Sequence, residues 1–164
     1  MANLEEFTVY KNTLMEAICT SDTIFNLIKL PTDSPNIECK DLRYTRIFPY
    51  NYVPLTIETA QTFICFTVTA PNVRKGVITD LTLTVFVFTH QDLMRTPNGM
   101  RVDLLISEID KLINGSTKYG LGKAELRTCD MLQVPARGYV GMFASYVVKD
   151  FSIDICNQYN KSGQ

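Results

Sequence analysis

The segment at residues 77–90, VITDLTLTVFVFTH, constrains the fold more than any other part of the chain. Every second residue from Leu81 to Val87 is aliphatic, and Phe86 and Phe88 occupy intervening positions. Alternation with a period of two is typical of a β-strand, and a strand with apolar residues on both sides is covered on both faces of its sheet. The sequence therefore predicts that residues 77–90 form a central strand with both faces covered.

The segment at residues 99–113 has a helical period instead. Its apolar residues recur at spacings of three and four, while Asp103, Asp110 and Lys111 fall on the opposite side. Asn114-Gly115 follows directly and is a usual signal for the end of a helix. These features predict one long amphipathic helix.

The remaining segments predict two more helices and several strands. Residues 3–19 show helical spacing, and Thr20-Ser21-Asp22 can cap a short helix that stops before Pro31. Residues 44–52 predict a short edge strand, because Pro54 follows and proline cannot donate to a strand ladder. Further strands are predicted at residues 61–70, 123–134 and 139–155, with turns at residues 71–76 and 135–138 and a bend near Lys149-Asp150.

This order of elements predicts an α+β fold, with a mostly antiparallel sheet on which an N-terminal helix and one long amphipathic helix pack. The chain has 164 residues, of which 46% are hydrophobic, so it can bury a core and is unlike a disordered chain. We expect residues 1–164 to form a single domain, in which the polar residues 157–164 are a flexible tail. With 16 basic and 17 acidic residues, the chain lacks the basic excess of a dedicated nucleic-acid binder.

The five cysteines do not form a recognisable pattern. Their number is odd and no two have the spacing C-x-x-C, so neither a disulfide framework nor a zinc site is indicated. We expect reduced, mostly buried thiols, as is usual in the cytosol. The sequence has no signal peptide and no apolar run of about 20 residues, so it predicts a soluble intracellular protein that does not enter a membrane.

No group of residues has the spacing of a catalytic or metal site. His90 and Asp92 could contribute to a general base or a metal site, but no nucleophile or third ligand accompanies them, and a surface or interface role for His90 is favoured. The glycine-containing stretch at residues 119–123 lacks the spacing of a phosphate-binding loop and precedes a strand, so it is expected to be a connector. We therefore predict no catalytic residue, no bound metal and no cofactor.

A metal-dependent nuclease is the main enzymatic alternative. Asp80 and Asp92 flank the central strand, and acidic clusters at strand ends can hold Mg²⁺ in nucleases. Asp103, Glu108 and Asp110 add three acids on the predicted helix, but acids on an amphipathic helix are expected to face solvent. A protein that is not an enzyme is therefore favoured.

Basic residues at the predicted turns are the candidate interface residues. They are Arg74 and Lys75 at one hairpin tip, Arg137 at another, and Arg95 and Arg101 around the turn before the long helix. Arginines on protruding turns commonly contribute to protein interfaces, although the same residues can simply keep a surface soluble. Long strands also leave sheet edges that must be covered or paired, and this requirement favours a homo-oligomer.

Over nearly its whole length, the chain resembles the tail terminator (tail completion) proteins of long-tailed bacteriophages. The features that carry the resemblance are Val53-Pro54 before the strand at residues 61–70, the hydrophobic strand at residues 81–88, the helix sequence ISEIDKL at residues 106–112, and closing strands with YVG at residues 139–141 and YVV at residues 146–148.

The resemblance implies a structural protein of the virion that assembles in the host cytoplasm. Proteins of this kind form a hexameric ring on the last ring of the major tail-tube protein, stop tube polymerisation and present a surface to the head-tail connector or neck proteins. DNA passes through the lumen without being read, which agrees with the nearly neutral net charge. The alternatives are another neck protein, such as a head-closure or adaptor component, the small phage nuclease considered above, or a host α+β binding module.

Overall fold

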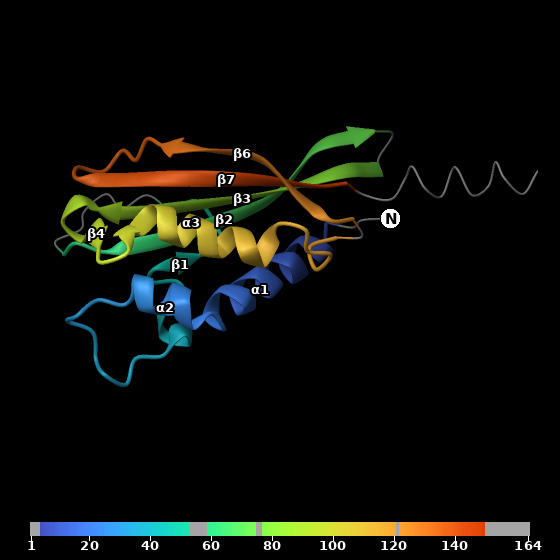
Figure 1. The fold of residues 1–164 in the computed structure, drawn as a ribbon. Coiled ribbons are helices and arrows are strands. Elements are labelled where there is room, and N and C mark those ends of the chain that lie inside the picture. Colours follow the sequence, from blue (N-terminus) through green and yellow to red (C-terminus); the bar gives the residue numbers. More distant parts are fainter. Residues whose placement is uncertain (1–3, 53–58, 75–76, 121, 150–164) are drawn as a thin grey trace, which may run out of the picture.

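In the part of the chain that the computed structural model describes (residues 4–52, 59–74, 77–120 and 122–149), three α-helices cover one face of a five-stranded sheet (Figure 1). The strands lie in the order β1-β2-β3-β7-β6. Their bounds are β1 (Ile47–Phe48), β2 (Thr62–Arg74), β3 (Val77–His90), β6 (Ala124–Leu132) and β7 (Tyr139–Lys149). The helices are α1 (Glu6–Cys19), α2 (Asp22–Ile28) and α3 (Arg101–Ile113), with two 3₁₀ turns, η1 (Cys39–Leu42) and η2 (Gln91–Leu93).

β3 is the central strand, and its bounds are those that its sequence predicts. It pairs antiparallel with β2 on one side and with β7 on the other. Val85, for example, stands opposite Phe66 and Ala144, and all three residues are buried under the helices. β6 pairs antiparallel with β7, but β1 pairs parallel with β2, so the α+β fold is confirmed with a sheet that is mixed.

The amphipathic helix α3 buries its apolar stripe against β3 and β7. Val102, Leu105 and Ile109 are buried, at the spacings that predicted a helix here. Asp110, at the edge of this stripe, accepts a hydrogen bond of 3.0 Å from the hydroxyl of Tyr146 in β7. α1 packs against β2, so the N-terminal helix and the amphipathic helix both lie on the sheet as predicted.

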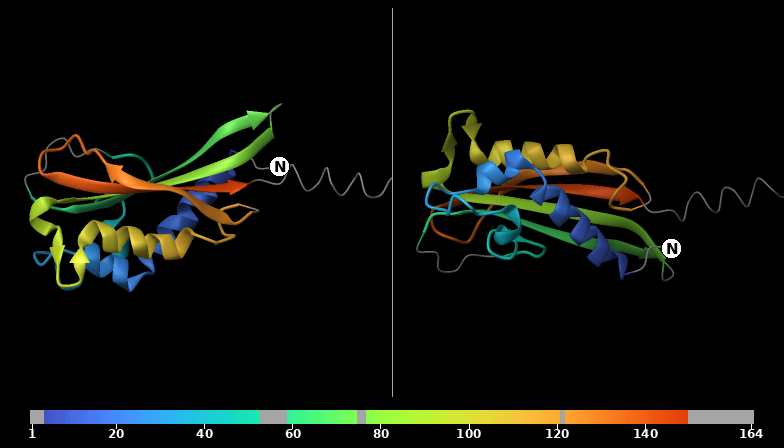
Figure 2. Two further views of the ribbon diagram at one scale, coloured as in Figure 1. Left: turned by 45° about the horizontal axis from the view of Figure 1, so that its top comes forward. Right: turned by 90° about the horizontal axis from the view of Figure 1, so that it is seen from below.

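The opposite face of the sheet is covered only toward one end. There the rings of Phe63 and Phe88 stack with centroids 5.2 Å apart, and Phe48 and Tyr52 pack beside them. Further along β3, Phe86 on this same face remains half-buried. The expectation that both faces of the central strand are covered is therefore correct for the helix face and wrong for much of the other, because no helix of the described residues lies there (Figure 2).

Two strand boundaries differ from the sequence prediction. β2 continues to Arg74 through the turn predicted at residues 71–76, because register shifts between Thr69 and Val73 accommodate Pro71 as a bulge. The edge strand predicted at residues 44–52 is only two residues long.

The start of α3 also differs from the prediction. Residues 99 and 100 form the strand β5 (Gly99–Met100), which pairs with β4 (Arg95–Thr96) in a short hairpin, so the helix begins at Arg101. The end of the last predicted strand, the bend at Lys149-Asp150 and the tail at residues 157–164 lie partly or wholly outside the described residues. A single domain over residues 1–164 stays a prediction.

The connector after α3 packs closely against the end of β7. Gly120 has a φ of 144°, and a Cβ atom there would lie 2.8 Å from Cγ1 of Val148. A Cβ atom at Gly122 would overlap the carbonyl oxygen of Lys149. The two glycines therefore let the backbone approach β7, which side chains would prevent.

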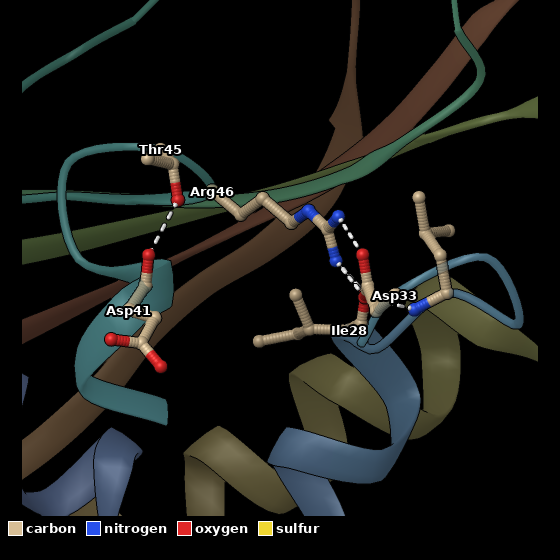
Figure 3. Close-up of polar contacts among 6 residues, drawn as sticks. Ile28, Asp33, Asp41, Thr45 and Arg46 are labelled. Carbon is tan, nitrogen blue, oxygen red and sulfur yellow. Dashed lines mark hydrogen bonds and ion pairs between the residues drawn. The ribbon is translucent and has the colours of Figure 1, made fainter. Parts of the chain in front are cut away.

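A buried ion pair anchors the long loop between α2 and β1 (Figure 3). The guanidinium of Arg46 donates to both carboxylate oxygens of Asp33 at 2.6 Å each, and it also donates to the carbonyl oxygen of Ile28 at 3.3 Å. The side chains of Arg46 and Asp33 are each only 10% exposed. The backbone amide of Leu30 donates to the same carboxylate at 2.7 Å, so its charge is well compensated.

We expect Asp33→Ala to lower the free energy of unfolding by about 3 kcal/mol, because it leaves the buried guanidinium of Arg46 without a counter-charge. Urea denaturation of the full chain measures this loss. The control is Lys111→Ala, which removes an ion pair of the same 2.6 Å length from an exposed lysine and should cost less than about 0.5 kcal/mol. Equal losses in the two variants would contradict the role assigned to Asp33.

The same pair predicts a dependence on pH. The hydrogen bonds from Arg46 and from the amide of Leu30 hold the pKa of Asp33 below its usual value, against the opposing effect of burial. This stabilisation is therefore complete above the pKa of the unfolded chain and is lost as the pH falls through the lower pKa of the folded state. We expect the difference in unfolding free energy between the wild type and Asp33→Asn to be constant between about pH 5 and pH 7 and to shrink below about pH 4. A difference that is equally large at about pH 3 would show that the carboxylate charge does not matter.

Candidate functional site

The predicted interface residues do not form one surface. Arg95 and Arg137 are exposed, and they belong to the β4–β5 hairpin and the β6–β7 turn, which lie at the same end of the sheet (Figure 1). Arg74 is the last residue of β2 and lies at the opposite end, and Lys75 is outside the described residues. The structure therefore separates Arg74 from Arg95 and Arg137, and an interface role for these residues stays a prediction.

Arg101 holds the fold together. Its Nε donates to the carbonyl oxygen of Leu93 at 2.7 Å, and its Nη1 donates to the carbonyl oxygen of Leu27 in α2. Partial burial lowers the pKa of its guanidinium. Arg101 is half-buried rather than fully exposed, and its contacts join α2 to the start of α3, while an interface role for it stays a prediction.

His90 caps the turn η2. Its Nδ1 accepts a hydrogen bond of 3.3 Å from the amide of Asp92, and its ring packs edge-on against Tyr139 with centroids 5.3 Å apart. Gly138 leaves room for this ring, since a Cβ atom there would lie 2.6 Å from Nε2. These contacts give His90 a structural role at the end of the sheet.

The acidic residues weighed for a nuclease are dispersed. Glu108 forms an ion pair with Lys111, and Asp110 accepts a hydrogen bond from the hydroxyl of Tyr146. Asp80 accepts a hydrogen bond of 3.3 Å from the side-chain amide of Asn72. Within the described residues, no three His, Cys, Asp or Glu side chains are grouped so that they could hold a metal ion.

A hollow of about 610 Å³ opens between α2, the loop that follows it and the start of α3. Three charged residues line it: Asp33 and Arg101 already take part in the contacts described above, and Nζ of Lys29 lies over the ring of Phe25, 5.7 Å from its centroid. The hollow therefore offers few groups that could hold a ligand.

The most distinctive surface is the edge of the sheet formed by β6. α3 covers β3 and β7 but stops short of this strand, and eight of the nine residues of β6 are exposed or half-exposed. Leu126 is 41% exposed and Met131 is 71% exposed, and Cys129 is exposed between them. Their partners in β7 belong to the helix-covered face, so these three side chains continue the apolar core face beyond the last helix. We call Leu126, Cys129 and Met131 the β6 apolar edge.

The apolar residues of the β6 apolar edge can be found in the sequence only if a bulge is allowed for, because they do not follow a strict period of two. The strand was predicted, but the spacing 126, 129, 131 breaks the period of two, and the structure has a register shift between Leu126 and Thr128. A bulge at this point returns the later apolar residues to the same face. This edge is exposed because α3 covers β3 and β7 but not β6, and the sequence of β6 does not indicate how far across the sheet the helix reaches.

The other edge of the sheet is also open for most of its length. β1 pairs with β2 only at Ile64 and Cys65, and no strand of the described residues pairs with the outer side of β2 from Phe66 to Arg74. Among the described residues, the sheet therefore has two different edges whose backbone groups no neighbouring strand pairs along most of their length.

The cysteines are less buried than the sequence suggests. The cysteines of the described residues are free thiols: Cys65 is buried, Cys19 and Cys39 are half-buried and Cys129 is exposed, while Cys156 lies outside the described residues. The expectation of mostly buried thiols is therefore wrong for the described cysteines, and Cys129 is exposed because α3 does not cover the edge strand β6.

None of the helices in the described part of the chain is long and apolar enough to cross a lipid bilayer. Comparison with curated proteins gave no match, and comparison with solved structures gave none. A protein-family model, YomW, matches residues 21–148. This segment runs from the cap of α2 to the penultimate residue of β7 and so contains the sheet, α2 and α3 but not α1. Since the match spans well over half of the sequence, the chain belongs to the YomW family.

Proposed function

We propose that this protein is a tail terminator, a virion protein that forms a ring on the end of a phage tail tube, stops tube polymerisation and joins the tail to the head connector. The observation that carries the proposal is the pair of unlike open edges of the sheet, β6 on one side and β2 on the other. A molecule with two complementary, unlike edges assembles head to tail, and such contacts close into a ring when the rotation between copies allows it.

The strand directions fit such a contact. β2, β3, β7 and β6 follow one another in antiparallel pairs, so β6 runs opposite to β2. In copies related by rotation about an axis along the strands, β6 of one copy meets β2 of the next in antiparallel orientation. Antiparallel pairing of this kind would satisfy the free backbone groups of both edges.

The side chains of the β6 apolar edge support a covered position. Leu126 and Met131 expose large apolar surfaces beside free backbone groups, which is costly for an isolated molecule and favourable at an interface. Glu125, Arg127 and Asp130 alternate with them and would limit pairing to a partner with suitable charges.

The proposed partners follow from this role. They are further copies of the chain in a hexameric ring, the major tail-tube protein on one face of the ring and neck proteins on the other, with DNA passing through the lumen. The nearly neutral net charge suits a conduit that does not hold phosphates. The dispersed acidic residues favour this role over a nuclease.

We expect Leu126→Lys/Met131→Lys to weaken ring assembly at least about tenfold without unfolding the chain, because both residues are exposed in the single molecule and covered in the ring. Light scattering after gel filtration should show particles several times the 18.6 kDa of one chain for the wild type, alone or with tail tubes, and a shift to monomers for the variant. Negative-stain images of tubes polymerised with the wild type should show rings at one tube end and a limited tube length.

Val9→Lys is the matched control, because Val9 is 58% exposed on α1 and lies on neither sheet edge. This variant should assemble as the wild type does. Rings that form equally well with both variants would disprove the edge contact. A protein that never binds tail tubes and never limits their length would disprove the tail terminator role.

A further inference from the structure

Two cysteine side chains meet where the end of α1 contacts η1. Cys19 is the last residue of α1 and Cys39 is the first residue of η1. The thiol of Cys19 donates a hydrogen bond of 3.8 Å to the carbonyl oxygen of Cys39, so the two cysteines are in direct contact. Both side chains are half-buried, so small reagents from solvent can reach them.

Arg43 completes this cluster. Its Nη2 donates to Oε1 of Glu16 at 2.7 Å, which fixes the guanidinium beside the end of α1. Its Nε is buried without a conventional hydrogen-bond partner in the described residues, while the guanidinium lies close enough to Cys19 to hydrogen-bond a thiolate there. The arrangement therefore has a place for negative charge on the sulfur of Cys19.

The environment makes the two thiols unequal. Hydrogen bonding from the thiol of Cys39, together with the hydrogen bond and charge of Arg43, lowers the pKa of Cys19 to about 6, although burial and the negative charge of Glu16 oppose this change. The pKa of Cys39 is raised, because its proton is held by Cys19 and because it is half-buried. Near neutral pH, Cys19 is thus the nucleophile and Cys39 the protonated neighbour.

We propose that Cys19 and Cys39 are a peroxide-reactive pair that closes to a disulfide joining α1 to η1. The thiolate of Cys19 attacks one oxygen of hydrogen peroxide, so an S–O bond forms, the O–O bond breaks and the departing hydroxide takes a proton to become water. The sulfur of Cys39, after losing its proton to solvent, then attacks the sulfur of Cys19, and the S–O bond breaks with release of hydroxide, which is protonated. Two thiols are oxidised by two electrons in total, and one peroxide becomes two waters.

Formation of the sulfenic acid at Cys19 also removes the negative charge that raises the pKa of Cys39. The second thiol is therefore easier to ionise once the first has reacted, which favours closure of the disulfide over further oxidation of Cys19. The bond would enclose residues 20–38, including α2, in a covalent loop.

The chain provides its own comparison thiols. Cys129 is more exposed than Cys19, but burial and nearby acids raise its pKa, and burial raises the pKa of Cys65 to about 11. Exposure alone would make Cys129 the most reactive of these thiols, whereas thiolate character makes it Cys19.

The test uses the full reduced chain carrying Cys129→Ser and Cys156→Ser, which prevents links through the exposed or C-terminal thiols. After hydrogen peroxide at about pH 7 and alkylation, trypsin cleavage at Lys29 separates the two cysteines, and mass spectrometry of the non-reduced digest should show the Cys19 and Cys39 peptides linked. Free-thiol titration should fall by two per chain, and the melting temperature should rise by about 5 °C or more.

Two variants and the wild type complete the test. Cys39→Ser should stop at a sulfenic acid on Cys19 that dimedone captures, and Arg43→Gln should slow alkylation of Cys19 about tenfold near neutral pH with an unchanged circular dichroism spectrum. In the wild type, Cys19 should alkylate faster than Cys129. An absent linked peptide in the folded chain, sulfinic acid at Cys19 in place of the link, or alkylation of Cys19 no faster than Cys129 would each overturn the proposal.

Discussion

The antiparallel ladder around β3 is the constraint on which the rest of the structure depends. β3 pairs along its length with β2 and β7, and its odd-numbered residues from Leu81 to Val87 all face the helices. A slip of one residue against either neighbour would turn these aliphatic side chains to the uncovered face and expose them. The register of β3 therefore fixes which face α1 and α3 cover, and it also fixes which strands are left at the two edges.

The sequence predicts the parts of the fold that repeat regularly. The alternation in β3 and the helical period of α3 come from local packing rules, so residue types alone locate β3 and the body and end of α3 correctly. Prediction fails where a boundary depends on a distant contact or an irregular one. β2 passes through Pro71 because a bulge absorbs the proline, and Gly99 is in a hairpin because it pairs with Thr96.

The functional residues are harder to predict than the elements for the same reason. Arg101 is an arginine beside a turn, which is typical of an exposed interface residue, yet its partner is the carbonyl oxygen of Leu27, far away in the sequence. Arg46 lies in an aromatic segment, and nothing in the sequence around it indicates that its side chain will be buried in an ion pair with Asp33. The β6 apolar edge likewise depends on the lateral reach of α3, so a strand that is predicted correctly can still be assigned the wrong exposure.

The segment between α1 and β1 buries Ile24, Ile28 and Leu42 in the core, but polar contacts lie at its two ends, and these contacts give it a chemical sensitivity that the sheet lacks. One end is fixed to the body by Arg46 and Asp33, and the other lies beside Glu16, Arg43 and the thiol pair. Protonation weakens the first contact, whereas oxidation adds a covalent bond at the second, so acid and peroxide act in opposite directions on the same segment. Neither contact involves β6, and the outer side of β2 is likewise free of them. Changes in this segment can therefore be separated experimentally from assembly through the sheet edges, since the two depend on different residues.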